Sequence, residues 1–487
     1  MLIEYKPQPL RTPGRDREHW HTLGILALPT LLSAIDASIV YILLPSVRTD
    51  FGFSDTLLIW VINAQYFTYA VFLLISGRLT DLFGPRRVFL SGIALFTVGS
   101  LGCGTARHPG LFLLSRAVQG LGGALISPAS LTFALREFVS DGARVRAMSV
   151  LASVTVLGEC AAFLLGGLLT SFLNWRWIFL VNLPLGVAAF VAGHKFLSRC
   201  IENSGQPKLD IAGAMMVSGS MLLSLYALSD GVDHRFASSK MYLLICGAMS
   251  LLIAFVLVES HSPAPLIPPK IFLNRSFVGA NVVGVLLNAA MFSWGLTSTL
   301  YMQLVLKYSP LTVGLAYLPT SVIAALVSLS LSAKIIGRFG IRAPLMLGLV
   351  LVSAALALLA RVPENASMIF DVLPSMFLIG LGFGMASPPL QLATFCGVRP
   401  EDRGVASGIA TTLSMFGGLF GLSILFGAAT RRADQLRTAG ATVASALDAG
   451  YQEALLVAAS LVILAVWVSG RLIPSESNRA ARPEIGI

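Results

Sequence analysis

The chain has 487 residues, of which 55% are hydrophobic and 12% are charged, and its formal net charge is +10. A soluble protein carries about 25% charged residues, so this chain cannot cover its apolar surface as a soluble domain. The composition indicates a polytopic membrane protein, and apolar runs of roughly 20 residues indicate spanning helices rather than a barrel. The basic residues are dispersed among loops, which argues against a nucleic-acid-binding module and relates the charge to membrane topology.

Residues 1–21 contain four basic side chains but no apolar core or cleavage site, which is typical of a cytoplasmic tail rather than a signal peptide. About fourteen apolar runs follow, and they begin near residues 22, 57, 88, 110, 147, 177, 209, 240, 277, 311, 343, 369, 404 and 453. An even number of spans puts both termini on one side of the membrane, and most Lys and Arg residues lie in the loops of that side. The positive-inside rule then predicts that both termini are cytoplasmic. The absence of targeting features and the compact loops indicate a bacterial inner membrane.

The first span has one carboxylate, Asp36, in its middle. A carboxylate at bilayer depth is costly, so Asp36 is expected to face protein or water rather than lipid. Such a group can exchange a proton or hold a cationic substrate. The alternative is a hydrogen-bonded structural Asp that packs the first helix.

The second and third spans are joined by a charged turn that runs from Gly77 to Arg87. Gly77 and Gly84 permit close backbone approach and positive φ, and Pro85 prevents the preceding helix from continuing. Three arginines in so short a loop place it on the cytoplasmic side. In the alternative interpretation, the charges of this turn only fix the orientation of the protein in the membrane.

The fourth span contains Arg116, followed at successive i+4 steps by Gly120, Ala124 and Pro128. This small-residue face allows close helix approach, so the guanidinium is expected to point into the bundle. Arginine does not deprotonate, so its role would be to tune a nearby acid that carries protons. A permanent structural ion pair is the alternative.

The fifth span contains a second carboxylate at bilayer depth, Glu159. Gly158, Ala162 and Gly166 form a small-residue stripe for packing against another helix, and Glu159 is rotated roughly 100° from it. Glu159 is therefore expected to line a cavity or a second helix interface.

A weaker set of polar and aromatic residues could line an amphipathic pocket, although aromatic residues near helix ends are more often interfacial anchors. This set consists of Gln65, Tyr66, Tyr69, Trp294, Tyr301 and Gln303. The 5 cysteines are scattered without a CxxC spacing, and the 6 histidines fall in tails, loops or span ends. We therefore expect no disulfide framework, metal site or cofactor.

The chain contains an internal repeat, as many transporters do. The corresponding residues are Arg78 with Lys334, Gly84 with Gly340, Arg86 with Arg342, Gly122 with Gly382 and Arg146 with Arg403. The second copy has Gly337 and Met376 in place of Asp81 and Arg116, so the ionisable groups that carry chemistry are expected in the first copy. The predicted organisation is an all-α 6+2+6 arrangement: tail 1–21, six-helix bundle 22–200, two extra helices in 201–262, six-helix bundle 263–472 and cytoplasmic tail 473–487.

Five stretches together resemble the fourteen-helix drug:H⁺ antiporter branch of the major facilitator superfamily. The charged turn fits the pattern G-x-x-x-D-x-x-G-x-[RK]-[RK] at Gly77, Asp81, Gly84, Arg86 and Arg87. The other matches are Ile35 through Pro45, Ser115 through Gly120, Asn174 through Pro184, and Leu300 through Pro319. One departure is that both prolines of the fifth-helix pattern G-P-x-x-G-P-x-x-G-G are absent, and Glu159 stands where one is expected.

The resemblance implies a major facilitator fold and a secondary transporter that exports a small amphipathic compound in exchange for protons. Asp36 and Arg116 are the proton-coupling candidates because both are ionisable at membrane depth, and Glu159, a carboxylate that the family pattern does not predict, is the reserve candidate. The resemblance also implies that the charged turn is a conformational latch, with Asp81 near the start of the thirteenth helix at Gly404–Val405 when the cytoplasmic side is closed. The expected partners are a small-molecule substrate, protons and the lipid bilayer, without nucleotide or nucleic acid.

Four other functions are alternatives to export. An ATP-driven pump is excluded within this chain because no G-x4-G-K-[ST] occurs, and an enzyme is disfavoured because no long loop, H-E-x-x-H or G-x-S-x-G cluster occurs. A proton-coupled uptake symporter of the same fold remains an alternative, as does a transporter-like receptor without flux. The sequence does not identify the substrate. Two carboxylates and one arginine are expected at the cavity, and this balance favours cationic or neutral compounds.

Overall fold

The computed structural model describes residues 16–138, 141–197, 211–233, 239–261, 269–363, 366–399 and 403–474, and within them every regular element is helical. The main helices of the first part are α1 (Asp16–Phe51), α2 (Asp55–Phe83), α3 (Pro85–Thr105), α4 (Pro109–Glu137), α5 (Asp141–Phe172), α6 (Trp177–Leu180) and α7 (Asn182–Phe196). They are followed by α8 (Ile211–Asp233), α9 (Ser239–His261), α10 (Arg275–Leu300), α11 (Pro310–Leu326), α12 (Ser332–Phe339), α13 (Arg342–Leu359), α14 (Leu373–Phe395), α15 (Arg403–Thr438) and α16 (Val443–Leu472).

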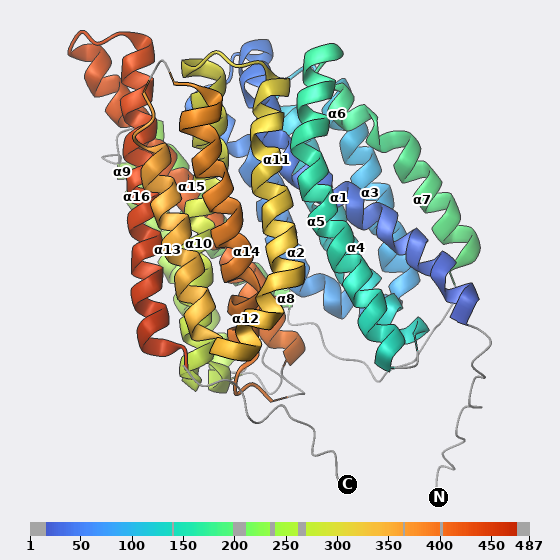
Figure 1. Cartoon of the computed structure of the whole chain (residues 1–487). Helices are drawn as coiled ribbons and strands as arrows, with labels where there is room; N and C mark the ends of the chain where they lie inside the picture. Colours follow the sequence, from blue (N-terminus) through green and yellow to red (C-terminus); the bar gives the residue numbers. More distant parts are fainter. Residues whose placement is uncertain are drawn as a thin grey trace, which may run out of the picture.

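Among the described residues, 13 helices are long and apolar enough to cross a membrane, and α8 adds the shorter apolar stretch Met215–Ser229. This agrees with the expectation of about fourteen spans in an all-α membrane protein. Helices α6 and α7 form one span, and α11 and α12 continue into one another through a π-helical turn at Val327–Leu331. The helices stand roughly parallel in Figure 1, where α1 begins and α16 ends at the lower end. We call this the terminal end and its opposite the distal end.

Helix boundaries follow local capping. Ser54 precedes α2, and its hydroxyl accepts a hydrogen bond from the Leu57 amide. Gly84 separates α2 from α3 with φ +80°, and Pro85 then opens α3. Gly340 separates α12 from α13 with φ +76°, so the turn predicted at Gly84 recurs at the matching position of the repeat.

The repeat also extends to the helix crossings. A Cβ on Gly92 of α3 would lie 2.9 Å from the Gly122 carbonyl oxygen of α4, and a Cβ on Gly348 of α13 would lie 2.6 Å from that of Gly382 in α14. Each crossing brings two backbones together where no side chain fits. The pairing of Gly122 with Gly382 in the sequence therefore marks two equivalent helix contacts.

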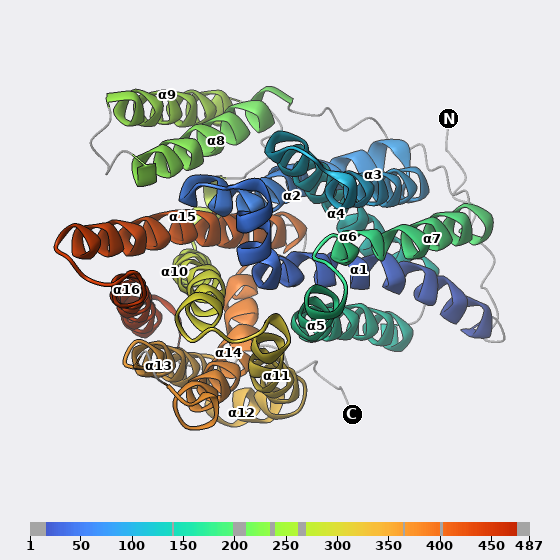
Figure 2. The ribbon, with the colours of Figure 1, turned by 90° about the horizontal axis from the view of Figure 1, so that it is seen from above.

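Helices α8 and α9 lie side by side at the edge of the molecule in Figure 2. Helix α8 packs against α9 on one side and against α2 and α15 on the other. This position fits the two extra helices predicted in 201–262. The 6+2+6 division and its boundaries stay a prediction, since residues 198–210, 234–238 and 262–268 lie outside the described residues.

The set α1–α7 contacts the set α10–α16 at the distal end. Phe163 of α5 stacks on Tyr317 of α11 with ring centroids 4.2 Å apart. Ser171 of α5 accepts a hydrogen bond from the Leu311 amide at 3.1 Å, and Gln303 donates to the Ile42 carbonyl at 3.0 Å. These contacts close the distal end of the molecule.

The two sets separate toward the terminal end, as the diverging lower parts of α5 and α11 show in Figure 1. Helices α2 and α15 contact where Asn63 donates to Ser423 at 3.1 Å, in the distal half. Farther down, a Cβ on Gly77 of α2 or on Gly404 of α15 would meet no atom within 4 Å. The described conformation is therefore closed at the distal end and open at the terminal end.

Candidate functional site

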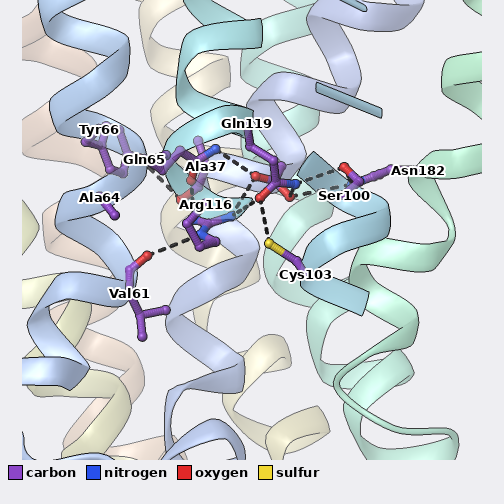
Figure 3. Close-up of polar contacts among 12 residues, drawn as sticks. Ala37, Val61, Ala64, Gln65, Tyr66, Ser100, Cys103, Arg116, Gln119 and Asn182 are labelled. Carbon is purple, nitrogen blue, oxygen red and sulfur yellow. Dashed lines mark hydrogen bonds and ion pairs between the residues drawn. The ribbon is translucent and has the colours of Figure 1, made fainter. Parts of the chain in front are cut away.

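Asp36 of α1 and Arg116 of α4 form an ion pair inside the first helix set, and Figure 3 shows the polar contacts around Arg116. The Arg116 Nη1 lies 2.8 Å from the Asp36 Oδ2, and both side chains are 0% exposed. Helix α4 also approaches α2 at Gly120, where a Cβ would clash with the Gln65 carbonyl. This close approach lets the Arg116 Nε reach the Val61 carbonyl of α2 at 3.2 Å.

Amide side chains bridge the two charges. Gln65 donates to the Asp36 Oδ2 at 2.7 Å and accepts a hydrogen bond from Arg116. Gln119 donates to the Asp36 Oδ1 at 3.0 Å and accepts from Arg116 at 3.0 Å. Asn182 of α7 donates to the same Asp36 oxygen at 3.5 Å, and Ser100 of α3 accepts from Gln119 at 2.9 Å. Five helices therefore converge on one buried polar network.

This network sets what the site can do chemically. Removing one partner of a buried ion pair leaves an uncompensated charge in a dry environment, which is strongly unfavourable. Protonation of Asp36 would remove its charge and free Arg116 and the bridging amides to rearrange. A proton at Asp36 is therefore linked to the packing of α1, α2, α4 and α7 against one another.

Glu159 stands on a different face of the bundle. The stripe of α5 containing Gly158 and Gly166 faces α1, since their Cβ atoms would lie 2.9 Å from Ala34 and 2.7 Å from Ile39. Phe163 and Gly167 of α5 face α11. Glu159 lies between these two faces and is exposed. Of the two locations expected from the sequence, this position favours the space between α1 and α11 over a second helix interface.

The charged turn is only partly described. Gly84 adopts the expected positive φ, and Arg86 donates to the His194 carbonyl at the end of α7. Arg87 is exposed. Gly77 lies within α2 with neither positive φ nor a close neighbour, so the expectation of close approach there is not met in this open conformation. The Asp81 side chain lies outside the described part of the chain, so its latch contact stays a prediction.

The six residues of the weak pocket set have different places. Gln65 belongs to the Asp36 network, and the Tyr66 ring packs 4.8 Å from Phe292 of α10. Trp294 is buried with its ring 5.2 Å from Tyr317, and its indole nitrogen has no hydrogen-bond partner.

The other three serve mainly as packing residues. The Tyr301 hydroxyl donates to the Val362 and Pro363 carbonyls at 3.2 and 3.0 Å, so this buried residue fixes a loop, and a role for it in a substrate cavity stays a prediction. Gln303 bridges the helix sets at Ile42, and Tyr69 packs beside Gly123 of α4. Within the described residues, no group of three His, Cys, Asp or Glu side chains could hold a metal ion.

Sequence reasoning did not single out Gln119, Ser100 or Asn182 as parts of the site. Gln119 and Asn182 lie in stretches that carry the family resemblance, and Gln119 is three residues after Arg116, on the same side of a helix. That spacing is the sequence signal that could have placed Gln119 beside Arg116 in the site. Nothing in the sequence brings Asn182 to Asp36, or Ser100 to Gln119 and Asn182.

Comparisons with known proteins agree with this fold. The family model described as Major Facilitator Superfamily matches residues 26–422. The chain is 32% identical over 473 residues to the puromycin resistance protein pur8 of Streptomyces alboniger, covering 96% of this chain and 94% of that one. It is 33% identical over 396 residues to the cephamycin export protein CmcT of Amycolatopsis lactamdurans, covering 81% and 82%.

Among solved structures, a bacterial homologue of the human lysosomal transporter Spinster, in an inward-facing and unoccupied conformation, matches with a TM-score of 0.66. That match has 14% sequence identity and covers 94% of this chain and 97% of the other, so it supports the fold alone. The chain belongs to the major facilitator superfamily.

Proposed function

We propose that this protein is a secondary transporter of the inner membrane that exports a small amphipathic compound in exchange for protons. The observation that carries the proposal is the dry ion pair of Asp36 and Arg116, because an ionisable pair at bilayer depth is characteristic of a coupling site. The named functions of the similar proteins, puromycin resistance and cephamycin export, support a drug or natural product as the exported compound.

Alternating access is the mechanism that fits the helix arrangement. The sets α1–α7 and α10–α16 rock against each other, and the described conformation faces the terminal end. Because basic residues favour the cytoplasmic side, the terminal end faces the cytoplasm and both termini are cytoplasmic. In this conformation Asp36 is ionised and paired with Arg116. It takes up a proton when the site faces the exterior.

Mutual exclusion at Asp36 couples the binding of protons to the binding of substrate. Arg116 or a cationic substrate competes with the proton for Asp36, so binding of one lowers the affinity for the other. Glu159, exposed between α1 and α11, is a second carboxylate that substrate can reach, and it is the reserve candidate for proton transfer.

Flux in proteoliposomes tests this function. A panel of amphipathic antibiotics that includes puromycin is supplied with an imposed pH gradient, and both substrate and proton movement are recorded. We expect protons and substrate to move in opposite directions. Movement in the same direction would establish the uptake symporter instead, and binding without flux would establish the receptor.

The charged turn provides a separate prediction about conformation. In a state closed to the cytoplasm, the Asp81 carboxylate would be stabilised by about 0.3–2 kcal/mol at the N-terminus of α15, near Gly404–Val405. Asp81→Asn is therefore expected to favour the terminal-open state. Labelling of a cysteine placed at the exposed Ala152 of α5 measures this, and it should become faster in the variant. Unchanged labelling would count against a latch.

A further inference from the structure

A basic pocket of about 510 Å³ lies at the terminal end, between the start of α10, the start of α13 and the end of α16. These three helices lie side by side in Figures 1 and 2. Arg275, Arg342 and Arg471 contribute one guanidinium from each helix, and none of the described residues that line the pocket is acidic.

The described part of the chain does not neutralise the three arginines. Within the described residues, no carboxylate lies within ion-pair distance of Arg275, Arg342 or Arg471. Three like charges around one pocket repel each other unless an anion enters. The electrostatics of the pocket therefore favour an anionic ligand.

The internal repeat gives an independent comparison. Arg86 in the first set corresponds to Arg342 in the second, and Arg86 donates to the His194 carbonyl at the end of α7. Arg342 lies beside the end of α16, 3.5 Å from the position of a Cβ on Gly470, but it makes no such hydrogen bond. Among the described residues, the arginine at this position of the fold thus has a hydrogen bond to the protein in one half and none in the other.

The pocket walls are firmly packed. A Cβ on Gly279 of α10 would lie 2.6 Å from the Leu472 Cβ of α16, and Ile473 is buried. Asn274 already accepts hydrogen bonds from the first amides of α10, at Ser276 and Phe277. The guanidinium groups, rather than free helix amides, are therefore the groups available to a ligand.

Apolar surface continues from this pocket along α16. The Arg471 guanidinium lies 5.7 Å from the Trp467 ring, which is 60% exposed, and Ile463 is exposed one turn farther along the helix. On a spanning helix such residues face acyl chains, with Trp at the level of the headgroups. The ligand should therefore combine a negative headgroup with hydrocarbon, which a free anion does not.

We propose that this pocket binds the phosphate headgroup of an anionic phospholipid from the leaflet at the terminal end, with its acyl chains along Trp467 and Ile463. Basic pockets between spanning helices bind such headgroups, and arginine pairs with phosphate through two parallel hydrogen bonds. The bound lipid holds α10, α13 and α16 together at the end where the two helix sets separate.

Native mass spectrometry of the full-length detergent-purified protein tests this site, with phosphatidylglycerol and phosphatidylcholine supplied in equal amounts. The wild type is expected to retain phosphatidylglycerol preferentially. The preference should fall by about fivefold for each arginine changed to Gln, and by roughly a hundredfold in Arg275→Gln/Arg342→Gln/Arg471→Gln. Arg338→Gln is the matched control, since Arg338 is an exposed arginine at the same end outside the pocket and should leave the preference unchanged.

Thermal unfolding of the wild type with phosphatidylglycerol or with millimolar inorganic phosphate distinguishes a lipid from a free anion, and it does not depend on the variants folding. Stabilisation by the lipid alone is expected. Equal stabilisation by inorganic phosphate would overturn the lipid assignment. An unchanged lipid preference in the triple variant, or equal loss in Arg338→Gln, would overturn the site.

Discussion

Asp36→Asn is expected to abolish accumulation of substrate driven by a pH gradient while leaving the protein folded in the membrane. Asn has the shape of Asp and keeps a carbonyl oxygen for Arg116, but it cannot exchange a proton. Arg116 also keeps its acceptors at Val61, Gln65 and Gln119. In the proposed proton cycle, residue 36 is neutral in one of the states, so folding should survive.

The measurement compares accumulation with downhill exchange in the same proteoliposomes. In Asp36→Asn, exchange of substrate without a gradient should persist, and accumulation against a gradient should fall to the level of protein-free vesicles. Glu159→Gln is the parallel variant and is expected to retain accumulation. If Glu159→Gln loses accumulation and Asp36→Asn keeps it, the coupling role passes to Glu159.

Arg116→Gln is expected to destabilise the protein by about 3–5 kcal/mol, because it leaves Asp36 charged and without its partner in a fully buried site. The double variant Asp36→Asn/Arg116→Gln removes both charges. Its loss of stability should be smaller than the sum of the two single losses, since no uncompensated charge remains. Free energies of unfolding in mixed micelles provide this double-mutant cycle.

Additive losses in that cycle would mean that the two charges do not stabilise each other, despite their 2.8 Å separation. Arg338→Gln serves as a control for general loss of a positive charge, because Arg338 is exposed and distant from the network. It should change the unfolding free energy by less than about 0.5 kcal/mol.

The sequence predicted the charged core of the site because isolated charges at bilayer depth are conspicuous. Asp36 and Arg116 stand alone in apolar runs, so each must find a partner or water. For Gln65 the sequence predicts a place in the pocket instead, because an amide side chain in a spanning helix is equally compatible with a contact to another helix and with a cavity. Its contact with Asp36 depends on how closely Gly120 lets α2 and α4 approach.

The limits of prediction have similar physical causes elsewhere. The last helix begins at Val443, ten residues before the predicted start, because Thr442 caps a helical stretch in which Asp448 and Gln452 interrupt the continuous apolar run. Tyr301 reaches the Val362 and Pro363 carbonyls, which are distant in sequence and leave no local signal. Hydrophobicity predicts which segments lie in the lipid bilayer. Helix caps decide where helices begin, and long-range contacts decide which side chains meet.

Proton movement driven by substrate tests the coupling role of Asp36 most directly. Proteoliposomes loaded with a transported antibiotic and a pH-sensitive dye are diluted into antibiotic-free buffer with no imposed pH gradient. If Asp36 is the coupling site, the wild type moves protons opposite to the antibiotic, because coupling acts in both directions. Asp36→Asn should release the antibiotic with no proton movement. Proton movement in Asp36→Asn at the wild-type ratio to substrate would contradict this account.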